Sequence, residues 1–300
     1  MRFDSQRVRV AVKLSQPGLV VKDPGILFSF FVAGVAVEMR ILFVGDIVGR
    51  PGRDALKNHL GHILESRRID LCIANAENSA AGNGITPRLG EELLGLKIDV
   101  LTSGNHIFDK KEVLPYFDQE PRLLRPANYP PSAPGRGLLV SQASNGIPYA
   151  VINLQGRVFM PAIDCPFRTG EALLASLGPE VKVIFIDFHA EATAEKEAMG
   201  YYFDGRVSAI VGTHTHVPTA DEQILPGGTA YISDSGMTGP HDSIIGVSKD
   251  IILPKFISQM PARFETATDD VRINAVEIVV NPETGHAASI ERFCMKVHDN

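Results

Sequence analysis

The chain has 300 residues, of which 44% are hydrophobic and 21% are charged. This length and composition predict a soluble globular protein with a sizeable core, built as one large α/β domain or two small ones. The net charge is −6, and no basic block is dense enough to follow a polyphosphate backbone. These features argue against long nucleic acid as the main partner, whereas a nucleotide remains compatible with them.

The cysteines give an expectation about the compartment. Cys72, Cys165 and Cys294 are odd in number and widely spaced, and none belongs to a C-x-x-C pair. Free thiols in a reducing environment are the simplest interpretation of this pattern. We therefore expect a cytoplasmic protein.

The first 38 residues differ from the rest of the chain. Their apolar segment, residues 26–37, has only 12 residues and is too short to span a bilayer. It could be the hydrophobic region of a cleaved export signal. However, Met39 opens a segment that has the character of a natural amino terminus entering a strand. We expect residues 1–38 to be a disordered extension from an upstream start, outside the functional domain formed by residues 39–300.

Polar residues follow each of the first three predicted strands. The apolar runs 40–44, 70–74 and 99–102 are predicted to be strands of one sheet. Open α/β sheets bind ligands at the carboxyl ends of their strands, so polar side chains at these positions are candidates for a site. The candidates from this part of the chain are Asp46, Glu77, Asn78, Asn105 and His106.

Helices are expected between these strands. Apolar residues at helical spacing predict a first helix over about residues 55–64. Thr86 followed by Pro87 predicts the start of a second helix that runs to about residue 96. Asp109 and Glu112 have capping-box spacing, so a third helix is expected to begin there, with Asp109 as its cap.

The middle of the chain is predicted to be irregular. Residues 121–146 are rich in proline and glycine, and they are expected to shape one wall of the site. Arg125, Asn128 and Tyr129 lie in this stretch. Contact with a nucleotide would explain these side chains, but the ordinary polarity of a surface loop explains them equally well.

The second half repeats the pattern of a strand followed by a polar residue. His189 follows the strand predicted at 181–187, and His214 and His216 follow the strand predicted at 207–211. Residues 234–240 are expected to form a loop. Residues 271–280 alternate in polarity, which predicts a half-exposed antiparallel strand. The remaining predictions are strands at 149–154, 230–233 and 291–297, a loop at 157–168 and helices at 169–177 and 192–199.

The candidate side chains share one kind of chemistry, because each offers a hard oxygen or an imidazole nitrogen. Five strand ends carrying such groups are hard to explain by packing, since turn residues usually occupy these positions. The mixture of donors suits borderline divalent metals better than calcium or magnesium. The donors are too numerous for one tetrahedral site and predict two metal ions that share a carboxylate.

A two-metal site predicts a reaction. Two ions about 3.5–4 Å apart can hold a hydroxide between them, lower its pKa and clamp phosphoryl oxygens during in-line attack. We therefore expect hydrolysis of a phosphate ester. His106, which is adjacent to Asn105, is the best placed general acid for the leaving alkoxide. Substrate binding without proton transfer is the alternative role for His106.

Several motifs carry a resemblance to a known family. Gly45-Asp46, the string GNH at 104–106, His189 after a strand and the string THTH at 213–216 resemble the calcineurin-like metallophosphoesterase superfamily. The strings FVGDIVG at 43–49, AEN at 76–78, GNHIFDKK at 104–111 and DSGMTGP at 234–240 resemble the bacterial YmdB-like phosphoesterases. The similarity covers about residues 39–298. It implies a four-layer α/β/β/α sandwich of two mixed sheets and hydrolysis of small phosphodiesters, above all 2′,3′-cyclic nucleotides.

The resemblance also implies a set of ligands. One metal would be held by Asp46, Glu77 and His216, and the other by Glu77, Asn105, His189 and His214. The usual D-x-H motif is replaced by Asp46-Ile-Val, so the first metal lacks one histidine. The resemblance implies that Asn78 replaces this ligand in part or contacts the phosphate. The alternative is that Asn78 is a buried amide that hydrogen-bonds its own loop.

Further expectations concern the cofactor and the surroundings of the site. Iron or manganese is expected as the metal, with zinc and nickel as alternatives. Asp234 and Thr238 are predicted to order the site without taking part in the chemistry. We expect a small nucleotide-like phosphoester as the partner, with no long nucleic acid and no membrane, and homo-oligomer formation stays open.

Three other functions remain open. A phosphomonoesterase or nucleotidase could use the same metals, because the sequence does not reveal the shape of the pocket. A regulatory scaffold could retain the site to sense a ligand. A nuclease acting on a polymer is disfavoured by the negative net charge.

Overall fold

A computed structural model describes residues 38–297 of the chain. The prediction for residues 1–38 falls, apart from Glu38, outside the described residues. Within the described part, no helix combines the length and the apolar character that crossing a bilayer requires.

The first sheet contains the amino-terminal strands of the domain. Its order is β2-β11-β12-β1-β3-β4, with β13 on β12. β1, β3 and β4 run parallel, whereas β12 is antiparallel to β1 and to β13, so the sheet is mixed. The strands are β1 (Met39–Val44), β2 (Asp46–Ile47), β3 (Leu71–Asn75), β4 (Val100–Thr102), β11 (Met237–Pro240), β12 (Val271–Val280) and β13 (Ala287–Lys296).

The second sheet is also mixed. Its order is β5-β6-β7-β8-β10-β9, with a parallel centre and an antiparallel strand at each edge. The strands are β5 (Leu138–Gln142), β6 (Pro148–Gln155), β7 (Val183–His189), β8 (Ala209–Thr213), β9 (Gln223–Ile224) and β10 (Ala230–Ile232).

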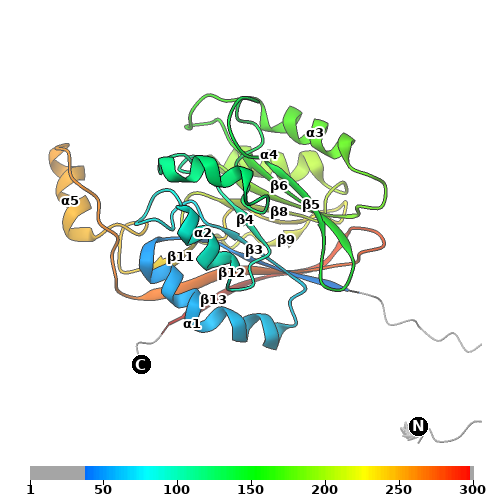
Figure 1. Cartoon of the computed structure of the whole chain (residues 1–300), viewed down its shortest axis with the longest axis horizontal. Helices are drawn as coiled ribbons and strands as arrows, with labels where there is room; N and C mark the ends of the chain where they lie inside the picture. Colours follow the sequence, from blue (N-terminus) through cyan, green and yellow to red (C-terminus); the bar gives the residue numbers. More distant parts are fainter. Residues whose placement is uncertain (1–37, 298–300) are drawn as a thin grey trace, which may run out of the picture. The chain divides into compact units, whose positions relative to one another are not determined.

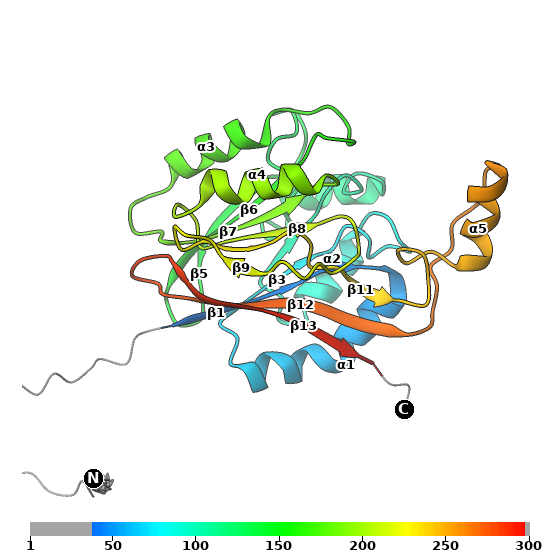
Figure 2. The same ribbon diagram turned by 180° about the vertical axis from the view of Figure 1, so that it is seen from behind.

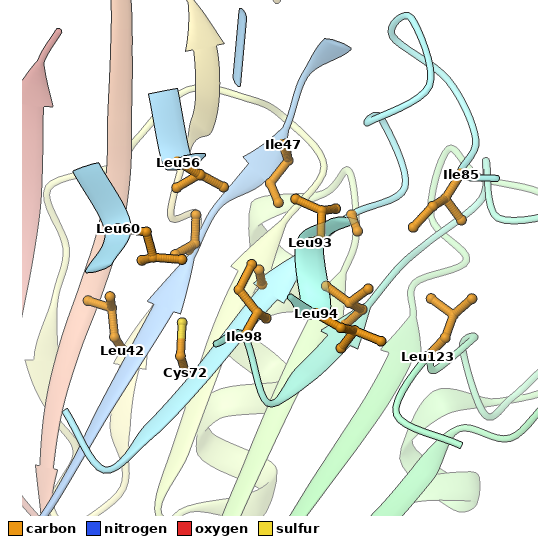
Figure 3. Packing of buried hydrophobic residues seen from close by; sticks show 14 of the residues in the cluster. Leu42, Ile47, Leu56, Leu60, Cys72, Ile85, Leu93, Leu94, Ile98 and Leu123 are labelled. Atoms are coloured by element: carbon orange, nitrogen blue, oxygen red, sulfur yellow. The ribbon is translucent and has the colours of Figure 1, made fainter. Parts of the chain in front are cut away.

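The two sheets pack face to face, with helices outside both (Figures 1 and 2). Phe43 of β1 and Phe185 of β7 stack between the sheets, with ring centroids 5.2 Å apart. The alternate residues of β1, such as Leu42, face outward and pack on the helices of that side (Figure 3). Burial on both faces explains why these strands read as continuous apolar runs. The helices are α1 (Gly49–Arg67), α2 (Pro87–Leu94), the 3₁₀ helix η1 (Lys111–Asp118), α3 (Pro166–Ser176), α4 (Thr193–Phe203) and α5 (Lys249–Ser258).

The predicted four-layer α/β/β/α sandwich is therefore confirmed. α1, α2 and η1 cover the outer face of the first sheet, and α3 and α4 cover that of the second. The predicted cap of α2 is also correct, because Thr86 Oγ1 accepts a hydrogen bond from the backbone N–H of Leu89 at 3.4 Å.

Four local predictions were wrong. The stretch 121–146 was expected to be irregular, but residues 138–142 form β5 because β6 supplies hydrogen-bonding partners. η1 begins at Lys111 without a side-chain cap, so Asp109 is not its cap. Residues 237–240, expected in a loop, form β11 because β2 and β12 supply hydrogen-bonding partners on both sides. β12 was expected to be half-exposed, but residues 273–280 are buried because its two faces contribute to two different cores.

Candidate metal centre and substrate cleft

The fold brings the predicted strand-end side chains to one edge of the sandwich. Glu77 and Asn105 follow β3 and β4 of the first sheet, while His189 ends β7 and His214 follows β8 of the second. Glu77 and His189 are fully buried, and His214 is partly exposed. The site therefore lies where the carboxyl ends of strands from both sheets meet, as open α/β folds favour.

The Nε2 atom of His189 is the centre of this group. Three other donor atoms lie around it: Glu77 Oε1 at 2.9 Å, Asn105 Oδ1 at 3.0 Å and His214 Nδ1 at 3.0 Å. A single N–H cannot satisfy three acceptors at good geometry. Among the described residues, Glu77, His189 and His214 form a group whose ligand atoms all lie within 4.8 Å of one another. The arrangement suits a cation better than a proton.

The charges in this group are strongly coupled. Burial acts against the charged form of His189, but the adjacent carboxylate of Glu77 outweighs it and raises the pKa of His189 to about 9. Burial likewise acts against ionised Glu77, but His189 lowers the pKa of Glu77 to about 2. Burial and the positive charge of His189 lower the pKa of His214 to about 3. In the absence of metal, His189 carries the proton and His214 is neutral.

A hydrogen-bond chain behind His189 fixes its ring. Thr213 Oγ1 donates to Asp187 Oδ1 at 2.7 Å, and this uses its only proton. Thr213 Oγ1 therefore accepts from Nδ1–H of His189, 2.9 Å away. The Nε2 atom of His189 is consequently the atom left to bind a metal. Asp187 is fully buried, and this burial raises its pKa to about 6.

Gly104 allows the β4 loop to approach His189. A Cβ atom at Gly104 would lie 2.0 Å from Cδ2 of the His189 ring. The glycine of the GNH string thus leaves space for the imidazole.

The loop after β8 holds its two histidines in an uncommon conformation. His214 has φ of 102° and His216 has φ of 66°, both in a region that non-glycine residues rarely adopt. The ion pair between Lys196 of α4 and Asp234 supports this loop, with Nζ and Oδ2 2.7 Å apart. Asp234 Oδ2 also accepts the backbone N–H of Thr215 at 3.0 Å. Asp234 thus orders the loop, as a supporting residue would.

The other predicted ligands surround this group. Asp46 Oδ2 accepts the backbone N–H of His214 at 3.3 Å, whereas its buried Oδ1 has no hydrogen-bond partner in the described chain. Asn78 donates from Nδ2 to the carbonyl of Gly82 at 3.0 Å, which is the predicted loop-holding alternative. The Oδ1 atom of Asn78 is also buried, and no group in residues 38–297 donates to it. Nδ1 of His216 lies 2.9 Å from the carbonyl of Ile245, so Nε2 is its free nitrogen.

These observations test whether the residues fit a metal centre. Buried carboxylate and amide oxygens without donors are costly unless a ligand pairs with them. The unpaired oxygens of Asp46 and Asn78 lie beside imidazole nitrogens that are free to bind, and this mixture suits a borderline divalent metal. The donor set therefore fits a metal centre. Both oxygens of Glu77 are held: Oε1 lies 2.9 Å from Nε2 of His189, and Oε2 accepts the backbone N–H of His106 at 2.9 Å.

A cleft of about 570 Å³ opens over the metal centre. His106 is partly exposed in this cleft, and its Nδ1 lies 2.8 Å from Asp109 Oδ2. Asp109 thus binds the histidine ring instead of capping η1. Residues that line the cleft include Glu77, Asn78, Asn83, His106, Lys110, His214, His216, Val247, Arg263 and Phe264.

Other sequence-based interpretations can now be assigned. Arg125 and Asn128 are buried and bind backbone carbonyls, so neither reflects surface polarity and neither faces the cleft. Tyr129 donates to Gln155 Oε1 at 3.3 Å. Thr238 binds the carbonyl of Asn274 at 3.1 Å and belongs to the sheet.

Sequence reasoning missed several supporting residues. Asp187 was read only as the end of an apolar strand. Glu191 was not assigned a role, yet its Oε2 lies 3.1 Å from Nε2 of His214 and orients that ring with Nδ1 toward His189. Lys196 lies in a helix of otherwise ordinary composition. A charged residue at a buried helix position is a weak signal that could have identified Lys196.

Comparisons with known proteins point to one family. The family model described as YmdB-like protein matches residues 42–293. The 2′,3′-cyclic-nucleotide 2′-phosphodiesterase of Bacillus subtilis (strain 168) is 48% identical over 255 residues, which cover 85% of this chain and 96% of that protein.

Two solved structures share the fold. A hypothetical protein from Thermus thermophilus has a TM-score of 0.81 and 40% identity, covering 86% of this chain and 99% of that one. A phosphatase from Mycoplasma pneumoniae has a TM-score of 0.82 and 32% identity, covering 87% of this chain and 94% of that one.

Proposed function

The chain belongs to the YmdB-like protein family, and on this basis we propose that it is a metal-dependent phosphodiesterase that hydrolyses 2′,3′-cyclic nucleotides. The observation that carries the proposal is the convergence of Glu77, Asn105 and His214 on Nε2 of His189, beneath a cleft of about 570 Å³. The 48% identity to a 2′,3′-cyclic-nucleotide 2′-phosphodiesterase supports this choice of substrate.

The proposed ligands form two sets. Glu77, Asn105, His189 and His214 would hold one metal, and Asp46, Glu77, Asn78 and His216 the other. When bound, such ions supply a water of lowered pKa and positive charge next to the phosphoryl oxygens. The mixed oxygen and imidazole donors suit a borderline divalent metal, and we propose iron or manganese, with zinc and nickel as alternatives.

The protein's own groups orient the substrate and move a proton. We assign His106 as the general acid for the departing ribose 2′ oxygen. Asp109 engages its Nδ1, so Nε2 is the nitrogen available to a substrate in the cleft. As a water oxygen bonds to phosphorus, proton transfer to the 2′ oxygen lets its bond to phosphorus break and leaves a nucleoside 3′-phosphate with a free 2′ hydroxyl.

A comparison of substrates tests this function. Hydrolysis of 2′,3′-cyclic AMP is measured beside hydrolysis of 3′-AMP, in the wild type and in His106→Ala. We expect turnover of the cyclic ester well above that of the monoester, and a loss of about 10²- to 10⁴-fold in kcat for His106→Ala. Metal content should remain that of the wild type. His62→Ala, at an exposed position of α1, is the matched control.

Other results would redirect the assignment. Faster turnover of 3′-AMP would contradict the phosphodiesterase assignment and favour a phosphomonoesterase. Bound metal without turnover of either ester would favour a ligand-sensing protein. Full activity of His106→Ala would remove the general-acid role.

We also propose that residues 39–300 form the catalytic domain and act in the cytoplasm. The family model begins to match at residue 42, which supports the proposed domain boundary. The three cysteines are free, as expected in a reducing compartment.

A further inference from the structure

The cleft has a second wall that the metal centre does not use. Arg263, Phe264 and Thr266 line it, on the segment that follows α5. α5 itself projects away from the sandwich (Figures 1 and 2). The chain therefore passes directly from the projecting helix α5 to the wall of the cleft.

Backbone contacts fix this segment beside the metal centre. Val247 and Thr266 form an antiparallel bridge. The N–H of Ser248 donates to the carbonyl of Glu265, and the N–H of Ala267 donates to that of Gly246, each at 2.9 Å. Val247, which pairs with Thr266, lies two residues after Ile245, whose carbonyl binds His216.

Thr266 also packs against the loop that begins α1. A Cβ atom at Gly49 would lie 2.8 Å from Thr266 Cγ2, and Gly49 has φ of +58°. The close packing leaves Phe264, two residues earlier, at a defined place in the cleft.

The ring of Phe264 is accessible. Phe264 is 48% exposed, although it lines a cleft. The ammonium of Lys255 lies over the ring, 4.2 Å from its centroid. This cation–π contact holds the ring from one side and leaves its other side for a ligand.

Two cations near this wall are available to an anionic ligand, although the carboxylates Glu77 and Glu265 also line the cleft. Lys110 and Arg263 both line the cleft, and neither forms an ion pair with a carboxylate of residues 38–297. A ligand with a flat apolar part and a phosphate would use both the accessible ring and the unpaired cations.

We propose that Phe264 is the nucleobase platform of this site, an inference that rests on the proposed hydrolysis of a cyclic nucleotide. The base stacks on the ring face opposite Lys255 while its cyclic phosphate lies at the metal centre. Aromatic side chains bind bases in this way with little dependence on base identity, because every base has a π face. The site would therefore distinguish cyclic nucleotides from cyclic phosphates that lack a base.

The test compares two substrates that differ only in the base. Wild type, Phe264→Ala and Phe264→Trp are assayed on 2′,3′-cyclic AMP and on ribose 2′,3′-cyclic phosphate. We expect Phe264→Ala to lower kcat/KM for cyclic AMP about tenfold, mainly through KM, as loss of one base–aromatic stack predicts. The base-free substrate should be hydrolysed at the wild-type rate, and Phe264→Trp should retain activity on cyclic AMP. Phe256→Ala, at an exposed α5 position outside the cleft, is the control.

Three outcomes would count against the proposal or its premise. Equal losses on both substrates, or no loss on either, would overturn the base platform. Wild type that hydrolyses neither substrate would overturn the proposed function instead. In that case the base platform is tested by calorimetric titration with 3′-AMP. Phe264→Ala should bind 3′-AMP more weakly than the wild type, and equal binding would overturn the platform.

Discussion

His189 Nε2 and His214 Nδ1 lie 3.0 Å apart, although His189 ends β7 and His214 follows β8 of the second sheet. Two imidazoles at this distance cannot both be charged, because each positive charge disfavours the other. Glu77, the third member of the group, comes from the opposite sheet. This candidate metal-binding group therefore joins the two sheets, and its side chains are positioned by the sandwich core.

Changing Thr213 should weaken metal binding without altering any ligand. Thr213→Val removes the acceptor for Nδ1–H of His189 and leaves Asp187 without one donor. We expect metal affinity to fall about 10- to 100-fold, as is typical when the support of a metal-bound histidine is lost. Competition with a metallochromic chelator measures this change. Thr213→Ser keeps the hydroxyl and should bind metal like the wild type, whereas equal affinity in the Val variant would contradict the role of Thr213.

The metal-stripped protein should lose stability as the solution becomes alkaline. The pKa of His189 is about 9 in the folded chain, above its usual 6.5, so its contribution is complete below pH 6.5 and is lost as pH rises to 9. Within this window the free energy of unfolding should fall by up to about 1.4 kcal/mol per pH unit. The pKa of Glu77, lowered from 4.5 to about 2, adds a loss as pH falls from 4.5 to 2.

Urea unfolding at several pH values checks this profile. His189→Gln should flatten the alkaline decline, and a decline that persists in this variant would point to another group. Metal affinity should follow the opposite trend and rise between pH 6.5 and 9, since metal displaces a proton from His189.

A methyl group at Gly104 should displace the His189 ring. The added Cβ would lie 2.0 Å from Cδ2 of the ring, so the ring or the loop must shift. We expect Gly104→Ala to lower kcat/KM about 10²-fold, because misplacement by about 1 Å can have this effect. Steady-state kinetics measures it. Gly61→Ala, where a Cβ meets nothing within 4 Å, is the matched control and should remain active. Normal activity of Gly104→Ala would show that the loop adapts.

The ion pair between Lys196 and Asp234 should contribute to folding as well as to the site. Lys196→Met leaves the carboxylate of Asp234 buried and without its cation. Loss of one partner from such a pair costs about 3–5 kcal/mol, which urea unfolding would detect. Lys196→Met combined with Asp234→Asn should recover part of that loss. A double variant no more stable than the single one would argue against an unpaired charge as the cause.

The sequence allowed the position of the site to be predicted because its donors follow strand ends. Asp46, Asn105 and His189 each come after an apolar run, and parallel strands bring such positions to one edge. The contact between the two sheets was not readable from these runs. The convergence of Glu77 on His189 was implied only by the family resemblance, and the structure shows it as a contact of 2.9 Å.

The failures have specific physical causes. The spacing of Asp109 and Glu112 fits a capping box, but the carboxylate of Asp109 binds His106 instead. α5 was not predicted, because Pro254 lies inside it and weakened the helical signal. Asp187 was hidden at the end of an apolar run, although its partners Asn75 and Thr213 come from different sheets.

The central claim is that these side chains hold the metals needed for turnover of a cyclic nucleotide. The most direct measurement determines metal content per chain of fresh protein and hydrolysis of 2′,3′-cyclic AMP, before and after treatment with a chelator. We predict about two transition-metal ions per chain, loss of turnover on chelation and recovery on addition of manganese or iron. Protein that binds no metal after loading, or that keeps full turnover after complete removal of metal, would contradict the account.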